Sequence, residues 1–129
     1  MQKITLKFEK FSRTLSSLNM IYLEEPRADR SNIDATIQRF EFTFELCWKF
    51  LKEFFLQKGL ELNYPKDVIK EAFASGFIED ELLWLQMLKD RNMTSHTYDE
   101  ILGDNIFQRI KNYVPLFIEL KDKLAAHIE

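Results

Sequence analysis

The spacing of apolar residues along the chain predicts an all-α protein. In the first segment, apolar side chains recur at steps of three and four residues, which places them on one stripe of an α-helix: Ile4, Phe8, Phe11, Leu15, Leu18 and Tyr22. We expect this helix to end near residues 24–26, because Pro26 blocks its continuation. Only three glycines and three prolines interrupt the 129 residues, so the whole chain favours long helices.

A second helix is expected over residues 31–58, and its apolar surface is unusually wide. Ser31 and Asp34 form a variant of the N-terminal capping box, and Gly59 is the predicted C-terminal stop. Apolar residues cover an arc of roughly 200°, whereas a surface helix usually shows about 100°. This helix is therefore either central to the bundle or shared with a second subunit.

The third and fourth helices are marked by their first turns. Pro65 fits the first turn of a short helix that ends near residues 75–76. Acidic residues 79–81 then crowd the start of a fourth helix, where they complement the helix dipole and need not bind a metal. We expect this fourth helix to end near residue 91 and to turn four large apolar side chains inward: Leu82, Trp84, Leu85 and Leu88.

The last helix has a T-x-x-E capping box at residues 97–100 and an apolar stripe that continues to Leu124. Pro115 lies well inside that stripe, so it predicts a kink and not a stop. With no internal repeat or linker, residues 1–129 are predicted to form a single domain. Its expected architecture is an up-and-down four-helix bundle with one extra short helix.

Composition and charge exclude several classes of protein. The formal net charge of −3 argues against nucleic-acid binding through a broad basic surface, but not against a small phosphate site. The single Cys47 cannot form an internal disulfide, and no apolar run approaches the ~20 residues of a membrane helix. No glycine-rich phosphate loop is present. We expect a cytoplasmic protein that contacts no membrane and uses no cofactor or metal.

One segment, residues 89–98, carries groups that could do chemistry. Arg91 should end the fourth helix and His96 should lie just before the last one, so both side chains should face a common notch. An arginine fork matches two phosphate oxygens, and a histidine can act as a general acid or base. Ser95 and Tyr98 add hydroxyl groups. The same residues could instead only cap two helices, and the physical chemistry leaves both interpretations open.

The string Arg91-Asn92-Met93-Thr94-Ser95-His96-Thr97-Tyr98 resembles the R-N-x-x-x-H-x-Y signature of the HEPN superfamily, in its R-x4-H-x-Y form. Residues 40–49 resemble the family's long second helix, and residues 65–73 and 84–91 follow it in the order expected of the family. The chain is thus similar over nearly its whole length to the HEPN proteins known as nucleotidyltransferase substrate-binding proteins. It departs nowhere from the short signature.

The resemblance implies a HEPN-like bundle that forms a homodimer and pairs with a minimal nucleotidyltransferase encoded beside it. In such toxin–antitoxin modules we expect the helical chain to be the substrate-binding subunit of the nucleotidyltransferase, and the alternative is a metal-independent ribonuclease. Carried over to this chain, Arg91 and His96 would be catalytic on RNA, and Tyr98 would be the residue that the partner adenylylates. Arg91, Asn92 and Ser95 are the expected phosphate-binding residues. The chain lacks the Gly-Ser and paired-aspartate pattern of a nucleotidyltransferase, so any nucleotidyl transfer belongs to the partner.

Overall fold

Five α-helices and one short 3₁₀ helix build the computed structural model, which describes residues 2–128. In chain order they are α1 (Lys3–Asn19), α2 (Ser31–Gln57), α3 (Pro65–Ala74), α4 (Glu81–Asn92), η1 (Thr94–His96) and α5 (Glu100–Ala125). The predicted all-α, up-and-down bundle with one extra short helix is confirmed.

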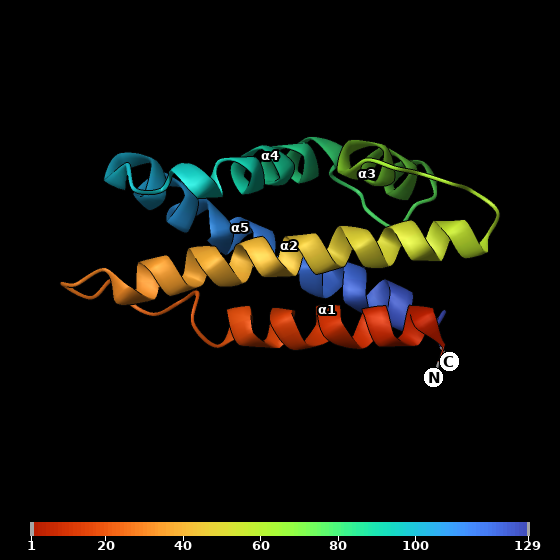
Figure 1. The fold of residues 1–129 in the computed structure, drawn as a ribbon, viewed down its shortest axis with the longest axis horizontal. Coiled ribbons are helices and arrows are strands. Elements are labelled where there is room, and N and C mark those ends of the chain that lie inside the picture. Colours follow the sequence, from red (N-terminus) through yellow and green to blue (C-terminus); the bar gives the residue numbers. More distant parts are fainter. Residues whose placement is uncertain (1, 129) are drawn as a thin grey trace.

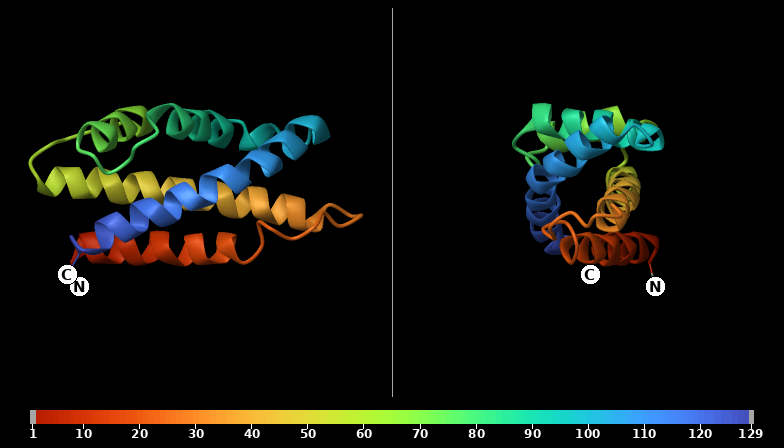
Figure 2. Two further views of the ribbon diagram at one scale, coloured as in Figure 1. Left: turned by 180° about the vertical axis from the view of Figure 1, so that it is seen from behind. Right: turned by 90° about the vertical axis from the view of Figure 1, so that its left-hand side faces the viewer.

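The helices are arranged around α2. In Figure 1, α1 runs antiparallel to α2 along one side, while α3 and α4 follow one another along the other side. α5 crosses behind α2 and returns to the end of the bundle where α1 begins (Figure 2). Because α3 and α4 together occupy one of the four helical positions, the molecule has the architecture of a four-helix bundle.

The wide apolar arc of α2 is explained largely by its central position, because α2 contacts α1, α3, α4, α5 and η1. The core that surrounds it is rich in aromatic rings. Phe40 stacks on Tyr113 with 5.6 Å between ring centroids, and Phe11 packs between Phe50 and Phe117. All five rings are fully buried. Burying each such side chain stabilises the fold by about 1.5–3 kcal/mol.

One predicted helix end and one predicted cap in the first half are wrong, although α2 does begin at Ser31 as predicted. α1 ends at Asn19, and the chain continues in single turns in which the Ile21 N–H donates to the Leu18 carbonyl. Ser31 is the first residue inside α2 and does not cap it. Its N–H donates to the Asp29 carboxylate (3.0 Å), while Arg30 adopts a left-handed φ of 63°. The predicted capping box does not form, because the carboxylate of Asp29 accepts the Ser31 N–H that Asp34 was expected to accept.

Two predictions for the second half are also wrong. Asp99 caps α5, because its carboxylate accepts the N–H groups of Ile101 and Leu102 at 3.0 and 3.2 Å. The Thr97 hydroxyl instead donates to the Thr94 carbonyl. Leu82 does not point inward and is 78% exposed, whereas Trp84 is buried. Two helical residues at this spacing are separated by about 200° around the axis, so only one of this pair can face the core.

Other local signals are confirmed. α3 begins at Pro65, and α2 and α3 are followed by glycines with left-handed φ angles, +87° at Gly59 and +81° at Gly76. Pro115 lies inside α5 without ending it. Among residues 2–128, no helix combines the length and apolar character that a membrane crossing requires.

Candidate functional site

The segment that joins α4 to α5 is held in a tight, ordered turn. The Thr94 hydroxyl donates to the Arg91 carbonyl (2.8 Å), and the Thr97 hydroxyl donates to the Thr94 carbonyl (3.0 Å). The His96 N–H in turn donates to the carbonyl of Met93 (3.0 Å). These bonds satisfy carbonyl groups that the end of a helix would otherwise leave unpaired. The predicted motif is therefore folded as one compact unit.

Arg91 is anchored to the central helix. Its Nη2 donates to Glu45 Oε2 on α2, a residue 46 positions away in the sequence. Its Nη1 lies 3.4 Å from Asn92 Oδ1 on the exposed side, and the Arg91 side chain is 28% exposed. Nε is buried and has no hydrogen-bond partner in the described part of the chain. One edge of the guanidinium is thus fixed, while the exposed Nη1 remains available to an anion.

Glu45 is itself fixed by two neighbours on α2. The Trp48 indole N–H donates to Oε2 at 3.1 Å, and the Lys49 ammonium lies 3.2 Å from Oε1. Partial burial alone would raise the pKa of Glu45. The bonds from Trp48 and Lys49 and the charge of Arg91 outweigh burial, so the pKa of this carboxyl is lowered. Glu45 therefore stays ionised and orients Arg91, a role that sequence reasoning missed.

The other predicted site residues lie at the surface of the same turn. Asn92, Ser95 and His96 are exposed, and Tyr98 is 83% exposed. The rings of His96 and Tyr98 lie edge to face, with 6.2 Å between centroids. The structure thus brings His96 and Tyr98 together on one surface, a few residues from the anchored Arg91. A polar substrate could reach all of them without any part of the core opening.

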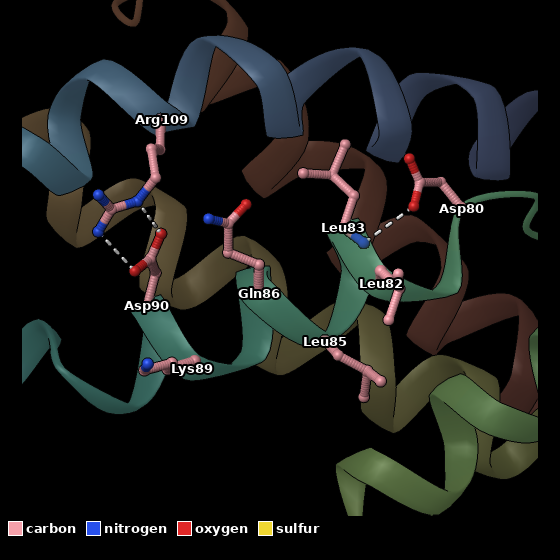
Figure 3. Close-up of a pocket in the computed structure, with 8 residues that line it drawn as sticks. All are labelled: Asp80, Leu82, Leu83, Leu85, Gln86, Lys89, Asp90 and Arg109. Atoms are coloured by element: carbon pink, nitrogen blue, oxygen red, sulfur yellow. Dashed lines mark hydrogen bonds and ion pairs between the residues drawn. The ribbon is translucent and has the colours of Figure 1, made fainter.

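Asp90, next to Arg91 in sequence, lies on the buried side of α4 and pairs with α5. Its carboxylate accepts hydrogen bonds from Arg109 Nε at 2.7 Å and Nη2 at 2.8 Å (Figure 3). It also accepts a hydrogen bond from the Tyr113 hydroxyl. Burial and the Asp90 charge both raise the pKa of Tyr113. Sequence reasoning missed this cluster. The available signal was Asp90 three residues after buried Met87, and Arg109 four residues before Tyr113.

A groove of about 830 Å³ runs beside α4 up to this ion pair. Figure 3 shows its lining, which mixes apolar and charged side chains from α4 with Arg109 from α5. None of the predicted site residues of the R-x4-H segment lines it. The groove is therefore adjacent to the motif and is not part of it.

Two further features of the described residues concern metal ligands and the single thiol. Residues 2–128 contain no group of three or more His, Cys, Asp or Glu side chains that could hold a metal ion. Cys47 is fully enclosed in the core, and burial raises its pKa far above the ordinary value for a thiol. A buried, protonated thiol is a poor nucleophile, so Cys47 acts as a small core residue.

Comparison with known proteins shows the class of helical domain to which this bundle belongs. Residues 6–126 match the family model described as "Nucleotidyltransferase substrate binding protein like", and the chain belongs to this family. A solved Haemophilus influenzae protein has the same fold, with a TM-score of 0.70 and 25% identity over 95% of this chain and 96% of its own. That structure is described as revealing the fold of a substrate-binding domain of a nucleotidyltransferase.

Two further relatives are more similar in sequence. A solved Thermus thermophilus protein is 38% identical, with a TM-score of 0.82, over 88% of this chain and 98% of its own. A Haemophilus influenzae protein named "Probable ribonuclease HepT" is 30% identical over 105 residues, which cover 78% of this chain and 72% of the relative. The suspected family resemblance is therefore confirmed.

Proposed function

We propose that this chain is a metal-independent ribonuclease of the HEPN type and the helical partner of a minimal nucleotidyltransferase, in a two-component toxin–antitoxin module. The observation that carries the proposal is an anchored arginine at the end of α4, followed in the adjoining turn by an exposed histidine. Arg91 is fixed by Glu45, and His96 lies at the surface of the adjoining turn. The relative named as a probable ribonuclease gives independent support.

In this proposal the chemistry is transesterification of RNA. His96 removes the proton from a ribose 2′-hydroxyl, whose oxygen attacks the adjacent phosphorus. The bond to the 5′-oxygen breaks, and this leaving oxygen takes a proton from solvent, so that a 2′,3′-cyclic phosphate and a 5′-hydroxyl remain. Arg91 stabilises the negative charge that develops on the phosphate oxygens. Asn92 and Ser95 provide further polar groups for the same phosphate.

Tyr98 is the proposed point of control. Its hydroxyl oxygen attacks the α-phosphorus of ATP on the partner enzyme, pyrophosphate leaves, and AMP becomes attached to the tyrosine. The exposure of Tyr98 and its 6.2 Å ring separation from His96 support this role. A bound AMP would add negative charge and bulk beside the histidine, and both would exclude an RNA phosphate.

The nucleotidyltransferase partner and the homodimer are proposed because of the chain's family membership. The family description and the Haemophilus substrate-binding domain support a nucleotidyltransferase as the protein that docks here. We also propose that the chain acts in the cytoplasm as a homodimer, with the R-x4-H turns of two copies facing each other. Two copies of Arg91 and Lys89 would then concentrate positive charge at a shared RNA site, against a monomer charge of −3.

The first test is RNA cleavage in excess chelator, after intact mass has shown that Tyr98 is unmodified. The wild type is compared with His96→Ala and with His127→Ala, which removes the chain's other histidine from the exposed turn after α5. We expect cleavage by the wild type and by His127→Ala, and none by His96→Ala. Equal cleavage by the two histidine variants would refute the role of His96.

A second candidate is a substrate-binding subunit without its own catalytic activity, which the Haemophilus structure's description favours. This candidate predicts no cleavage by the unmodified wild type, together with a stable complex with the nucleotidyltransferase that survives His96→Ala. Co-purification with the neighbouring nucleotidyltransferase measures the second part. Absence of both cleavage and a complex would overturn both candidates.

A further inference from the structure

A second polar groove, of about 450 Å³, lies between α1, α2 and the loop that leads to α3. α1 and α2 run side by side at this end of the bundle (Figures 1 and 2). Four lysines line the groove, Lys3 and Lys7 from α1 and Lys49 and Lys52 from α2, against two glutamates. The lining is therefore net positive in a chain whose overall charge is −3.

Two of these lysines are already paired and two are not. Lys3 lies 3.2 Å from Glu53, and Lys49 lies 3.2 Å from Glu45. Lys7 and Lys52 form no ion pair within residues 2–128. Partial burial, followed by the charge of Lys3, lowers the pKa of Lys7. An anion in the groove would offset this repulsion, so the arrangement favours a negatively charged ligand.

Trp48 adds a surface for an aromatic ring. It lines the groove, is partly exposed, and has the Lys52 ammonium 6.0 Å from its ring centroid. Lysines that follow a phosphate chain, together with an aromatic ring on which a base can stack, are the features that hold single-stranded nucleic acid. An acidic peptide would use the lysines but would leave the aromatic ring unexplained.

Residues of α2 link the groove to the R-x4-H site, because Lys49, which lines the groove, pairs with the same Glu45 that holds Arg91. Glu45, Lys49 and Lys52 follow one another on a single face of α2, at steps of four and three residues, and Glu45 holds Arg91. Seven helical residues span about 10 Å, which is about three nucleotides at a stacked spacing of about 3.4 Å. A strand bound in the groove could therefore reach Arg91, at the end of the helix that precedes the turn with His96.

We propose that the groove lined by Lys3, Lys7, Trp48, Lys49 and Lys52 binds the phosphate backbone of single-stranded RNA and delivers the strand to Arg91 and His96. The choice of RNA as ligand rests on the proposed ribonuclease function. The groove determines how tightly the strand is held, whereas the R-x4-H turn determines whether it is cut.

The test is a binding titration with a fluorescein-labelled single-stranded RNA of twelve nucleotides, followed by anisotropy over a range of NaCl concentrations. The protein carries His96→Ala so that the probe stays intact. The groove variant adds Lys7→Gln and Lys52→Gln, which leaves the two lysine–glutamate pairs in place. The matched control adds Lys66→Gln and Lys70→Gln, which remove two exposed lysines on α3 outside the groove.

Each lost phosphate contact on a single strand reduces the steepness of log affinity against log salt by about 0.7, so two lost contacts reduce it by about 1.4. At 0.1 M salt this change corresponds to an affinity about 25-fold lower. The α3 control should change affinity by less than about threefold, since it removes charge without removing contacts. Replacement of Lys7 and Lys52 by arginine should restore binding. RNA should also shield Trp48 from acrylamide quenching in the parent protein, since the other tryptophan, Trp84, is buried. Equal effects of the groove and α3 variants, or no effect of either, would overturn the inference.

Cleavage by the wild type, measured separately, distinguishes this inference from the proposed function. If a groove variant with His96 intact binds and cuts RNA normally, the RNA-binding role of the groove is refuted and the ribonuclease function stands. If the unmodified wild type binds RNA through Lys7 and Lys52 but never cuts it, the RNA-binding groove is supported and the ribonuclease function is refuted. A groove variant that loses its nucleotidyltransferase partner with unchanged RNA affinity makes the groove a protein-docking site and overturns the inference.

Discussion

Replacement of Arg109 by methionine tests the buried cluster that joins α4 to α5. The Asp90 carboxylate is 6% exposed and takes two of its three hydrogen bonds from Arg109, at 2.7 and 2.8 Å. Methionine keeps much of the aliphatic packing of arginine but removes its charge and all its donors. Asp90 is then left as a buried charge whose remaining donor is the Tyr113 hydroxyl.

The expected cost follows from this geometry. Removing one partner of a buried ion pair typically destabilises a protein by about 3–5 kcal/mol. Arg109 is 33% exposed, so water can partly replace the guanidinium, and Tyr113 still donates. We therefore expect the free energy of unfolding to fall by about 2–3 kcal/mol. The loss of stability should be greatest near the end of α4, where Asp90 and Arg91 are neighbours, and backbone amides there should exchange faster with solvent.

Urea denaturation followed by circular dichroism at pH 7 measures this loss. Arg13→Met, which removes an exposed arginine on α1, is the matched control and should change stability by less than about 0.5 kcal/mol. The double variant Asp90→Leu/Arg109→Met should recover most of the stability, because no buried charge is left unpaired. An Arg109→Met protein as stable as the Arg13→Met control would refute the reasoning.

Four other predictions concern single groups. Because the folded protein holds the Tyr113 proton to a higher pH than the unfolded chain, stability should fall as the pH rises above about 10, and Tyr113→Phe should flatten this fall in urea midpoints. Gly76→Ala should destabilise by about 1 kcal/mol, since φ is +81° although a Cβ would meet no atom within 4 Å; Gly76→Asn should cost less in the same urea assay. The Cys47 thiol should react with a disulfide reagent only in the unfolded protein, and rapid reaction of the native protein would contradict its burial. Glu45→Gln should lower kcat/KM for RNA cleavage by about tenfold, because Arg91 loses its charged anchor, while the control Gln38→Glu, at an exposed position of the same helix, should leave kcat/KM unaltered.

The sequence by itself determined which segments are helical and where several of them stop. Apolar spacing along the chain depends only on the 3.6-residue period, and the left-handed turns after α2 and α3 need glycine at Gly59 and Gly76. The short R-x4-H string was also visible as a local pattern. The capping residues were assigned wrongly, because Asp29 and Asp99 each lie two residues from the Ser31 and Thr97 caps that the sequence suggested and take the backbone N–H groups instead.

Only the tertiary structure decided which polar groups meet. Glu45 and Arg91 are 46 residues apart, and Asp90 and Arg109 are 19 apart, so no local period relates them. Their pairing depends on how α2, α4 and α5 are rotated and crossed, which is set by packing around buried rings such as Phe40 and Tyr113. The lysine groove has the same origin. Its charges are scattered through an acidic sequence, and they form one surface because α1 and α2 pack antiparallel.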